Sequence, residues 1–283
     1  MGFLLAKSVF SRHYMFMQKA RFIRLVNTYY TLHGRHTLPW RLTNDPYKII
    51  VSEIMLQQTQ VARVLEKYTE FLALFPTVQI LAEASLQDVL RVWTGLGYNR
   101  RAKFLKQMAA AIVSEYNGVF PKTIAQLQTL PGIGPYTARA VAAFAYNIPS
   151  AFIETNIRTI YLHHFFEGQE GVTDAQLMEK IEATLDRDHP CEWYWALMDY
   201  GAHLKRMGIR AHRASTHYVR QSAFKGSKRA VRGHIIAILK DAPCTTIRLY
   251  KRIEEEKERI DTVLADLQKE QFIVFKNRTW MIQ

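Results

Sequence analysis

The segment from Leu130 to Ile160 constrains the fold most, because it joins a glycine-rich turn to a run of helix-forming residues. Pro131, Gly132 and Gly134 are expected to supply the bends and positive φ angles that bring backbone N–H groups to one side of the turn. The Ala-rich run at 136–146 then predicts that this turn lies at a helix N-terminus. Such turns are often purely structural. Here no Walker lysine accompanies it, so a phosphate bound there is expected to belong to a nucleic-acid backbone.

Most of the remaining chain is also predicted to be helical. Asp45 is expected to cap a helix that has Pro46 in its first position and runs to about Lys67. Further helices are expected at 21–30, 71–74, 78–83, 85–93 with Ser85 as cap, 100–116, 173–185 and 192–204. No stretch of this part alternates with period two, so the core is predicted to contain no strands.

The predicted helix after Asp45 is apolar nearly all round, which is typical of a buried helix. Glu53 lies inside this apolar run. A carboxyl group buried among apolar side chains has a raised pKa and keeps its proton near neutral pH, as a general acid requires. The alternative is a structural glutamate paired with an arginine.

Composition limits the class of protein and its partners. The 283 residues are 48% hydrophobic, enough for one large or two modest soluble domains. Lys and Arg outnumber Asp and Glu by 38 to 25, and the net charge of +13 favours a polyanionic partner, although charge alone leaves ribosomal and membrane-surface roles open. Cys191 and Cys244 lack CxxC spacing, so neither a disulfide framework nor a zinc site is predicted.

Residues 1–20 are interpreted as an N-terminal extension. They mix basic and apolar residues without an acid, as a mitochondrial transit peptide does. We favour instead an unstructured or over-extended start, with Met15 or Met17 as alternative initiators, and a cytoplasmic or nucleoid location inside the cell. The apolar runs are too short to span a membrane.

The C-terminal part has the pattern of a small separate domain. Residues 225–233 have linker composition, and helices are expected at 233–240, 245–254 and 260–270, the last beginning near Asp261 as cap. The final segment FIVFKNRTWMI predicts a hairpin. Three short helices and a hairpin resemble a winged-helix domain.

Three sequence blocks, in the family's order, resemble the helix-hairpin-helix DNA glycosylases, most closely adenine DNA glycosylases of the MutY type. The blocks are DPYKIIVSEIMLQQTQV, WTGLGYNRRAKFL, and LPGIGPYTARAV followed by FIETNIR. The resemblance covers roughly 38–201. It implies a mainly α, two-lobed glycosylase core at 21–224 followed by the winged-helix-like domain at 225–283, and a monomer that binds double-stranded DNA with a mispaired or damaged base.

The resemblance assigns the chemistry to two carboxylates. Glu53 would protonate the base, and Glu154 would oppose the positive charge that develops on the sugar. Glu154 stands where the family has aspartate, and its side chain is longer by one C–C bond of about 1.5 Å. Tyr136 stands where glycosylase–lyases of the endonuclease III type have their Schiff-base lysine, which implies a monofunctional enzyme. Its hydroxyl is expected to bond the Glu154 carboxylate, unless the ring only packs.

The same resemblance implies DNA contacts. Gln57, Gln58 and Thr59 would fill the space left by a flipped-out base, and Tyr98 would wedge beside the opposite base. Asn99 replaces a second tyrosine of the family. The remaining assignments are phosphate contacts at Gly132 and Gly134, ordering of the loop behind Glu154 by Asn156, and a pocket for the target base at Arg41 and Asp199. Without the resemblance, each of these last two would be taken for a surface residue in an ion pair of its own.

Two departures concern cofactors and recognition. Iron–sulfur members of the family carry four cysteines after the equivalent of residues 199–224, and this segment has none, so we expect no cluster. The spacing of His203, His212 and His217 fits no standard metal site, and the segment is expected to contact phosphates. The larger C-terminal domain with which the family reads 8-oxoguanine is also missing.

These observations leave three hypotheses. The first is a monofunctional DNA N-glycosylase that removes adenine opposite guanine or 8-oxoguanine. The second is a glycosylase of the same superfamily for thymine, uracil or another deaminated or alkylated base, favoured by the missing 8-oxoguanine domain and by Asn99. The third is a catalytically reduced, structure-specific DNA-binding protein, for which only the replacement at Glu154 argues.

Overall fold

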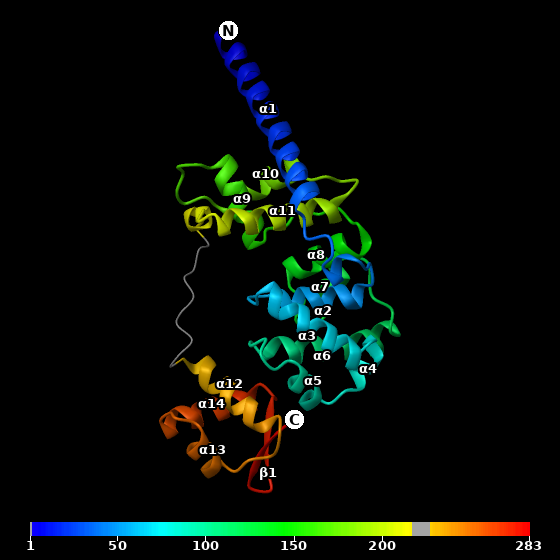
Figure 1. Cartoon of the computed structure of the whole chain (residues 1–283), viewed down its shortest axis with the longest axis vertical. Helices are drawn as coiled ribbons and strands as arrows, with labels where there is room; N and C mark the ends of the chain where they lie inside the picture. The colour runs from blue at the N-terminus through cyan, green and yellow to red at the C-terminus, as the bar shows by residue number, and fades with distance from the viewer. Residues whose placement is uncertain (1, 217–226) are drawn as a thin grey trace. The chain divides into compact units, whose positions relative to one another are not determined.

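The computed structural model describes residues 2–216 and 227–283 and is mainly α, as predicted (Figure 1). The helices are α1 (Gly2–His33), η1 (Pro39–Arg41), α2 (Pro46–Leu56), α3 (Val61–Leu74), α4 (Val78–Glu83), α5 (Leu86–Val92), α6 (Arg100–Tyr116), α7 (Ile124–Thr129), α8 (Pro135–Tyr146), α9 (Thr155–Phe165), α10 (Asp174–Thr184), α11 (Pro190–Arg206), η2 (Ala211–Ala214), α12 (Lys228–Leu239), α13 (Thr246–Arg252) and α14 (Lys257–Lys269). In the described part of the chain, the strands are β1 (Ile273–Lys276) and β2 (Thr279–Ile282).

The described residues form two compact units, one of residues 2–44 and 138–216 and one of residues 45–137 and 227–283. In the first unit, α9 and α1 both pack against α11. An aromatic cluster joins them, in which the ring of Phe22 lies 5.2 Å from that of Tyr161 and 6.2 Å from that of Trp193. The rings of Tyr161 and Trp193 are almost fully buried, so this cluster forms much of the core of the unit.

The second unit packs α2 against α3, and α6 against α4 and α5. Its largest fully buried side chains include Met55, Phe71, Trp93, Leu105 and Met108, which come from four different helices or their ends. Leu105 and Met108 lie three residues apart on the buried face of α6, which is the helical spacing expected for this segment.

The C-terminal module, residues 227–283, belongs to this second unit. Its hairpin is antiparallel, with Ile273 opposite Ile282 and Lys276 opposite Thr279, as predicted. Cys244 N donates to Trp280 O at 2.9 Å and so ties the hairpin to the segment before α13. The module thus contains the three helices and the hairpin expected from the sequence.

Three predicted helix starts are wrong. The helix predicted to start at Arg21 is α1, which already begins at Gly2, so the chain start is helical and not unstructured, and an over-extended start stays a prediction. The expected linker at 225–233 is helical from Lys228, because the Ser227 side chain caps α12 by accepting from Ala230 N and places Ala230 in the core. Asp261 does not cap α14, which begins four residues earlier at Lys257.

The early start of α14 shows in its backbone, because Ile260 N already donates to Glu256 O at 3.1 Å and Asp261 therefore lies inside the helix. Ile260, Val263, Leu264 and Leu267 recur at helical spacing and are all buried, so the helix must already be formed at Ile260. Asp261 lies on the exposed side, where it accepts from the hydroxyl of Tyr250 at 2.6 Å.

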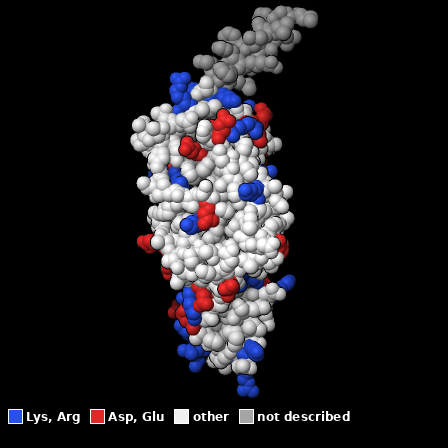
Figure 2. All heavy atoms as spheres, turned by 90° about the vertical axis from the view of Figure 1, so that its right-hand side faces the viewer, with Lys and Arg blue, Asp and Glu red and all other residues white. Residues whose placement is uncertain are grey.

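Charged side chains are scattered on the face shown in Figure 2. Lys and Arg lie singly or beside Asp and Glu on an otherwise uncharged surface, so the positive excess of the chain is not gathered there. Among the described residues, no helix is both long and apolar enough for a membrane span.

Candidate active site and nucleic-acid interface

Glu53 lies on α2, whose start follows the local sequence. The Asp45 side chain accepts from Tyr47 N at 2.9 Å, and Pro46 occupies the first turn without needing a hydrogen-bond acceptor. Eight of the eleven residues of α2 are buried, and Glu53 is one of them at 7% exposure. The hydroxyl of Tyr136 donates to Glu53 Oε2 at 3.0 Å. The sequence analysis expected this hydroxyl to bond Glu154, and that expectation stays a prediction.

α2 ends at Leu56, so the predicted continuation of this helix to Lys67 is wrong. Gln58 has φ +57°, a left-handed conformation that a helix cannot contain, and α3 starts anew at Val61. Arg101 on α6 explains the break. Its guanidinium donates to three carbonyl oxygens of the last turn, those of Ile54 at 2.7 Å, Met55 at 3.0 Å and Gln57 at 2.6 Å.

Arg101 also orders a second loop. Its other terminal nitrogen donates to Thr59 Oγ1 at 3.1 Å and to the carbonyl oxygens of Leu96 at 2.9 Å and Gly97 at 3.1 Å. Burial lowers the pKa of Arg101 to about 10, so the side chain stays charged at neutral pH. We identify Arg101 as a positioning residue that joins the QQT segment (57–59) to the LGY segment (96–98). The sequence analysis missed it because one basic residue in a helix carries no local signal of its partners.

The two loops present the predicted DNA-contacting residues. Gln58 and Tyr98 are both exposed and both have positive φ, +57° and +47°. A non-glycine residue in this region is uncommon and costs about 1–3 kcal/mol, so the surrounding contacts must hold both loops in place. Gln57 turns inward, with Nε2 3.5 Å from Thr137 Oγ1, while the Thr59 hydroxyl lies 3.3 Å from Leu96 O. The structure thus brings the QQT segment and Tyr98 together.

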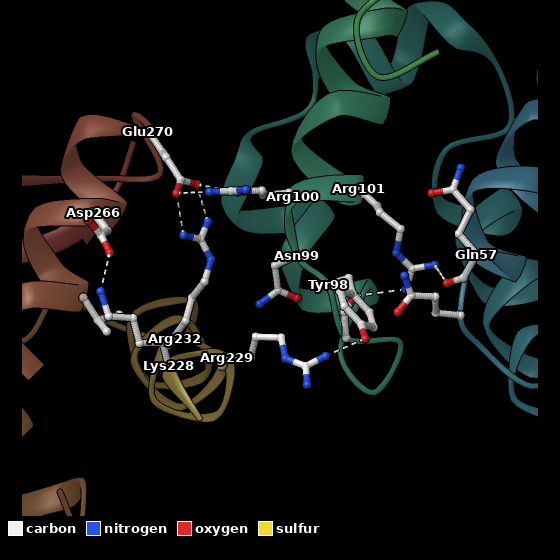
Figure 3. Close-up of a pocket in the computed structure, with 14 residues that line it drawn as sticks. Gln57, Tyr98, Asn99, Arg100, Arg101, Lys228, Arg229, Arg232, Asp266 and Glu270 are labelled. Atoms are coloured by element: carbon white, nitrogen blue, oxygen red, sulfur yellow. Dashed lines mark hydrogen bonds and ion pairs between the residues drawn. The ribbon is translucent and has the colours of Figure 1, made fainter. Parts of the chain in front are cut away.

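Tyr98 also meets the C-terminal module. Arg229 of α12 donates to the Tyr98 hydroxyl at 2.8 Å, and the guanidinium carbons of Arg101 and Arg229 lie 5.5 and 5.8 Å from the ring centroid (Figure 3). Asn99, next to Tyr98, lines the same cavity of about 820 Å³ together with Gln57 and Gln58.

The predicted turn lies between α7 and α8, as a helix-hairpin-helix requires. Gly132 has φ +77°, and a Cβ there would approach Phe104 Cβ to 2.5 Å, so only glycine fits. Gly134 differs from the prediction, because its φ is not in the left-handed region. A Cβ on Gly134 would meet nothing within 4 Å, so the fold does not demand glycine there and the backbone before α8 stays open to approach.

Glu154 lies in the first unit, as the N-cap of α9. Its Oε2 accepts from Asn156 N at 2.6 Å, and Lys205 Nζ donates to Asn156 Oδ1 at 2.8 Å. Burial raises the pKa of the Glu154 carboxyl above its ordinary value, against the opposing effects of the Asn156 N–H and of Lys205. Asn156 thus binds Glu154 through its backbone and Lys205 through its side chain, and its ordering role stays a prediction.

Arg41 and Asp199 form a buried ion pair. Arg41 Nη1 lies 2.7 Å from Asp199 Oδ2, Arg41 Nη2 lies 2.9 Å from Oδ1, and both side chains are at most 3% exposed. Arg35 adds its backbone N–H and Nε to the same carboxylate. Burial alone would raise the pKa of Asp199, but the hydrogen bonds and charges of Arg41 and Arg35 outweigh it and hold the pKa below its usual range. The pair is thus buried, and a role in a base pocket stays a prediction.

The residues of the chain do not fit an iron–sulfur cluster. Such a cluster needs four thiolate ligands, and the sequence holds two cysteines. Burial raises the pKa of the Cys191 thiol to about 12, which disfavours the thiolate that metal binding needs. No group of three or more metal-ligating side chains occurs among the residues whose side chains the structure describes. His217 lies outside the described residues.

Comparison with known proteins identifies the family. The model of the HhH-GPD superfamily of base excision DNA repair proteins matches residues 51–186. The adenine DNA glycosylase of Mycolicibacterium smegmatis is 35% identical over 257 residues, which cover 83% of this chain and 88% of that protein. The adenine DNA glycosylases of Buchnera aphidicola (subsp. Baizongia pistaciae) and Homo sapiens are 35% and 36% identical, but the match spans only 52% and 33% of their lengths, against 64% and 59% of this chain.

Solved structures agree on the fold. A thermostable thymine-DNA glycosylase superposes with a TM-score of 0.59 at 24% identity, over 66% of this chain and 88% of that one. Endonuclease III in a non-covalent DNA complex superposes with a TM-score of 0.53 at 15% identity, over 64% and 84%. The chain therefore belongs to the HhH-GPD superfamily of base excision DNA repair proteins and, within it, to the adenine DNA glycosylase family.

Proposed function

We propose that the protein is a monofunctional DNA N-glycosylase that flips adenine out of a mispair with guanine or 8-oxoguanine and hydrolyses its bond to deoxyribose. The observation that carries this proposal is the buried Glu53 on α2, 7% exposed and bonded to the Tyr136 hydroxyl. The names of the related proteins support adenine as the base. Flipping the base costs a few kcal/mol, which the contacts of the QQT segment and Tyr98 would offset.

In this mechanism Glu53 acts as the general acid. Oε2 of Glu53 accepts from Tyr136, and the same carboxyl group supplies the reacting proton. This proton goes to N7 of the adenine, the C1′–N9 bond breaks, and its electron pair leaves with the base. Glu53, now a carboxylate, accepts a proton from the water that attacks C1′, so the acid is restored at the end of the cycle.

Glu154 has the complementary role. A carboxylate facing the sugar stabilises the positive charge of an oxocarbenium-like transition state. The N–H of Asn156 holds the Glu154 carboxylate, and Lys205 in turn holds the Asn156 side chain. These contacts supply the rigidity that electrostatic stabilisation needs, because a side chain that reorients in response to the charge contributes less.

Hydrolysis would leave an intact strand. Tyr136 carries no amine, so no Schiff base forms with the sugar at this position. Borohydride would therefore trap no covalent adduct of the protein with DNA. If an adduct is trapped, and is also trapped with the Glu53→Gln variant, a lysine elsewhere in the chain is the nucleophile.

The experiment that tests the function is single-turnover excision on a panel of duplexes. The panel contains adenine opposite guanine and opposite 8-oxoguanine, thymine and uracil opposite guanine, an alkylated purine, and fully paired controls. We expect release of adenine from the first two duplexes alone, with cleavage of the strand only after alkali. Release of thymine or uracil instead would assign the protein to the second hypothesis, and binding without release of any base would assign it to the third.

A further inference from the structure

The C-terminal module contacts the core at defined points. Glu270, just after α14, accepts from Arg100 of α6 at 2.9 Å and from Arg232 of α12 at 2.7 Å (Figure 3). Lys103 of α6 donates to the carbonyl oxygens of Glu270 and of Gln271, and its Nζ lies 5.0 Å from the ring centroid of Phe272. The hydrogen bonds of Arg100, together with those of Arg232, hold the pKa of Glu270 at about 2, so this contact stays ionised at neutral pH.

A second contact lies at the other end of α12. Gln87 and Arg91 of α5 both donate to Lys240 O, at 2.8 and 3.1 Å. Since the module is held at both ends of α12, the side chains on this helix have a defined position relative to the Tyr98 loop. The module is therefore placed to take part in whatever the Tyr98 loop binds.

The cavity between α12, α14 and the two loops is electropositive. Its lining contains five cations, Arg100, Arg101, Lys228, Arg229 and Arg232, against two acids, Asp266 and Glu270. Glu270 is shared by Arg100 and Arg232, and Asp266 pairs with Lys228 at 3.6 Å, so the positive charge exceeds the negative. A concave surface with excess positive charge attracts phosphate.

Arg229 is the cation of α12 that lies against the Tyr98 loop. Arg101 is buried and held by six acceptor oxygens of the two loops, whereas Arg229 is half-buried on the surface of α12. Arg229 also touches Tyr98, the predicted wedge residue, so a phosphate bound by Arg229 would belong to a nucleotide beside the wedge.

This nucleotide is not the one that is hydrolysed. Glu53 and Tyr136 do not line the cavity, whereas Gln57, at the end of α2, does line it and has its Nε2 toward Thr137. The partner of a flipped nucleotide lies across the duplex axis, where Tyr98 is predicted to wedge, so the strand expected at this cavity is the strand opposite the excised base.

We propose that the C-terminal module is a binding element for the opposite strand, in which Arg229 binds one backbone phosphate of that strand next to the nucleotide against which Tyr98 wedges. The proposal rests on the proposed function, since it presumes that the substrate is duplex DNA with one flipped nucleotide. The module would then contribute affinity that does not depend on base identity, because a phosphate contact carries no sequence information.

The test uses the full chain and a duplex with a tetrahydrofuran abasic analogue opposite 8-oxoguanine, bound at 50–200 mM salt. Arg229→Gln should weaken binding about fivefold near 0.15 M salt and lower the slope of log K against log salt by about 0.9. Arg229→Lys should keep most of the slope. Arg248→Gln is the matched control, because Arg248 lies exposed on α13 of the same module and does not line the cavity, so its slope should equal that of the wild type.

The strand is identified with methylphosphonate linkages, which remove the charge of one phosphate at a time. We expect one linkage of the opposite strand at which neutralisation weakens the wild type about as much as Arg229→Gln does, with no further loss when both changes are combined. Coupling found only on the strand of the excised base, or equal slopes for Arg229→Gln and Arg248→Gln, would overturn the proposal. Wild-type excision on the same duplex with adenine in place of the analogue is measured in parallel, so that a failure of the proposed function is seen separately.

Discussion

Glu53 and Glu154 are two glutamates held by different parts of the fold. Glu53 projects from the interior of α2, where its own backbone is satisfied by the helix and only its side chain is positioned, by the Tyr136 hydroxyl. Glu154 precedes α9 as N-cap, so a backbone N–H of the first turn holds its carboxylate. A helix interior favours burial of a neutral acid, and the N–H groups of a helix N-terminus favour an anion, although burial outweighs them in the pKa of Glu154. The comparison predicts that the two side chains are not interchangeable.

The largest effect is expected from removal of the acid. Glu53→Gln keeps the size of the side chain but removes the proton that goes to the base, so single-turnover excision should fall at least about 1000-fold, within the range for general acid catalysis. Binding to a duplex with an abasic analogue should stay within a few-fold, because no phosphate contact is lost. Near-normal excision by this variant would show that Glu53 is not the acid.

The second largest loss of excision rate is expected from removal of the negative charge of Glu154. Glu154→Gln removes the negative charge that opposes the sugar cation, and we expect a loss of about 100-fold in the single-turnover rate. The amide oxygen can still accept from Asn156 N, so the thermal midpoint of unfolding should change little. A rate equal to that of the wild type would show that this carboxylate does not act in the transition state.

Removal of the C-terminal module should separate binding from chemistry. A chain ending before Lys228 loses the cations of α12 but keeps both carboxylates and the helix-hairpin-helix, so its affinity for duplex DNA should fall about tenfold or more and its salt dependence should become weaker. At saturating concentration the excision rate should stay within a few-fold. If the truncated chain folds, as judged by its circular dichroism, but excises nothing, the module contributes to the active site.

The smallest effect near neutral pH is that of the Glu154 titration. Burial raises the pKa of this carboxyl above the ordinary 4.5, so the rate should begin to fall on the acid side at a higher pH than for an exposed glutamate. The same shift makes the protonated form relatively more stable in the folded chain, so acid does not unfold the protein through this group. The acid limb should be missing in Glu154→Gln. If the excision rate of that variant falls on the acid side as it does for the wild type, the fall belongs to the titration of another group.

The sequence predicted those features that depend on local chemistry. The start of α2 at Pro46, the Ser85 cap and the C-terminal hairpin all follow from residues within a few positions of one another. The end of α2 was missed because Arg101, more than forty residues away, binds its last carbonyl oxygens. A contact of this kind is decided by packing of α6 and leaves no trace in the sequence of α2 itself.

For the same reason, the candidate site could be predicted only in part. The resemblance places Tyr136 and Glu53 in the site, yet the hydrogen bond between them was not foreseen, since it depends on how α8 approaches α2. The contact of Arg229 with Tyr98 was not foreseen either, because it joins segments 131 residues apart. Long-range partners of charged side chains need the tertiary structure.

The most direct test of the comparison shortens the side chains of Glu53 and Glu154 by one methylene group each. Single-turnover excision of adenine opposite 8-oxoguanine is measured for Glu53→Asp and Glu154→Asp beside the wild type. Glu53→Asp should lose about 100-fold, because its carboxyl withdraws by more than 1 Å from the base and from Tyr136. Glu154→Asp should keep or raise the rate, since aspartate is a good N-cap and is the residue that the family carries there. Equal losses in the two variants, or a larger loss in Glu154→Asp, would contradict the account.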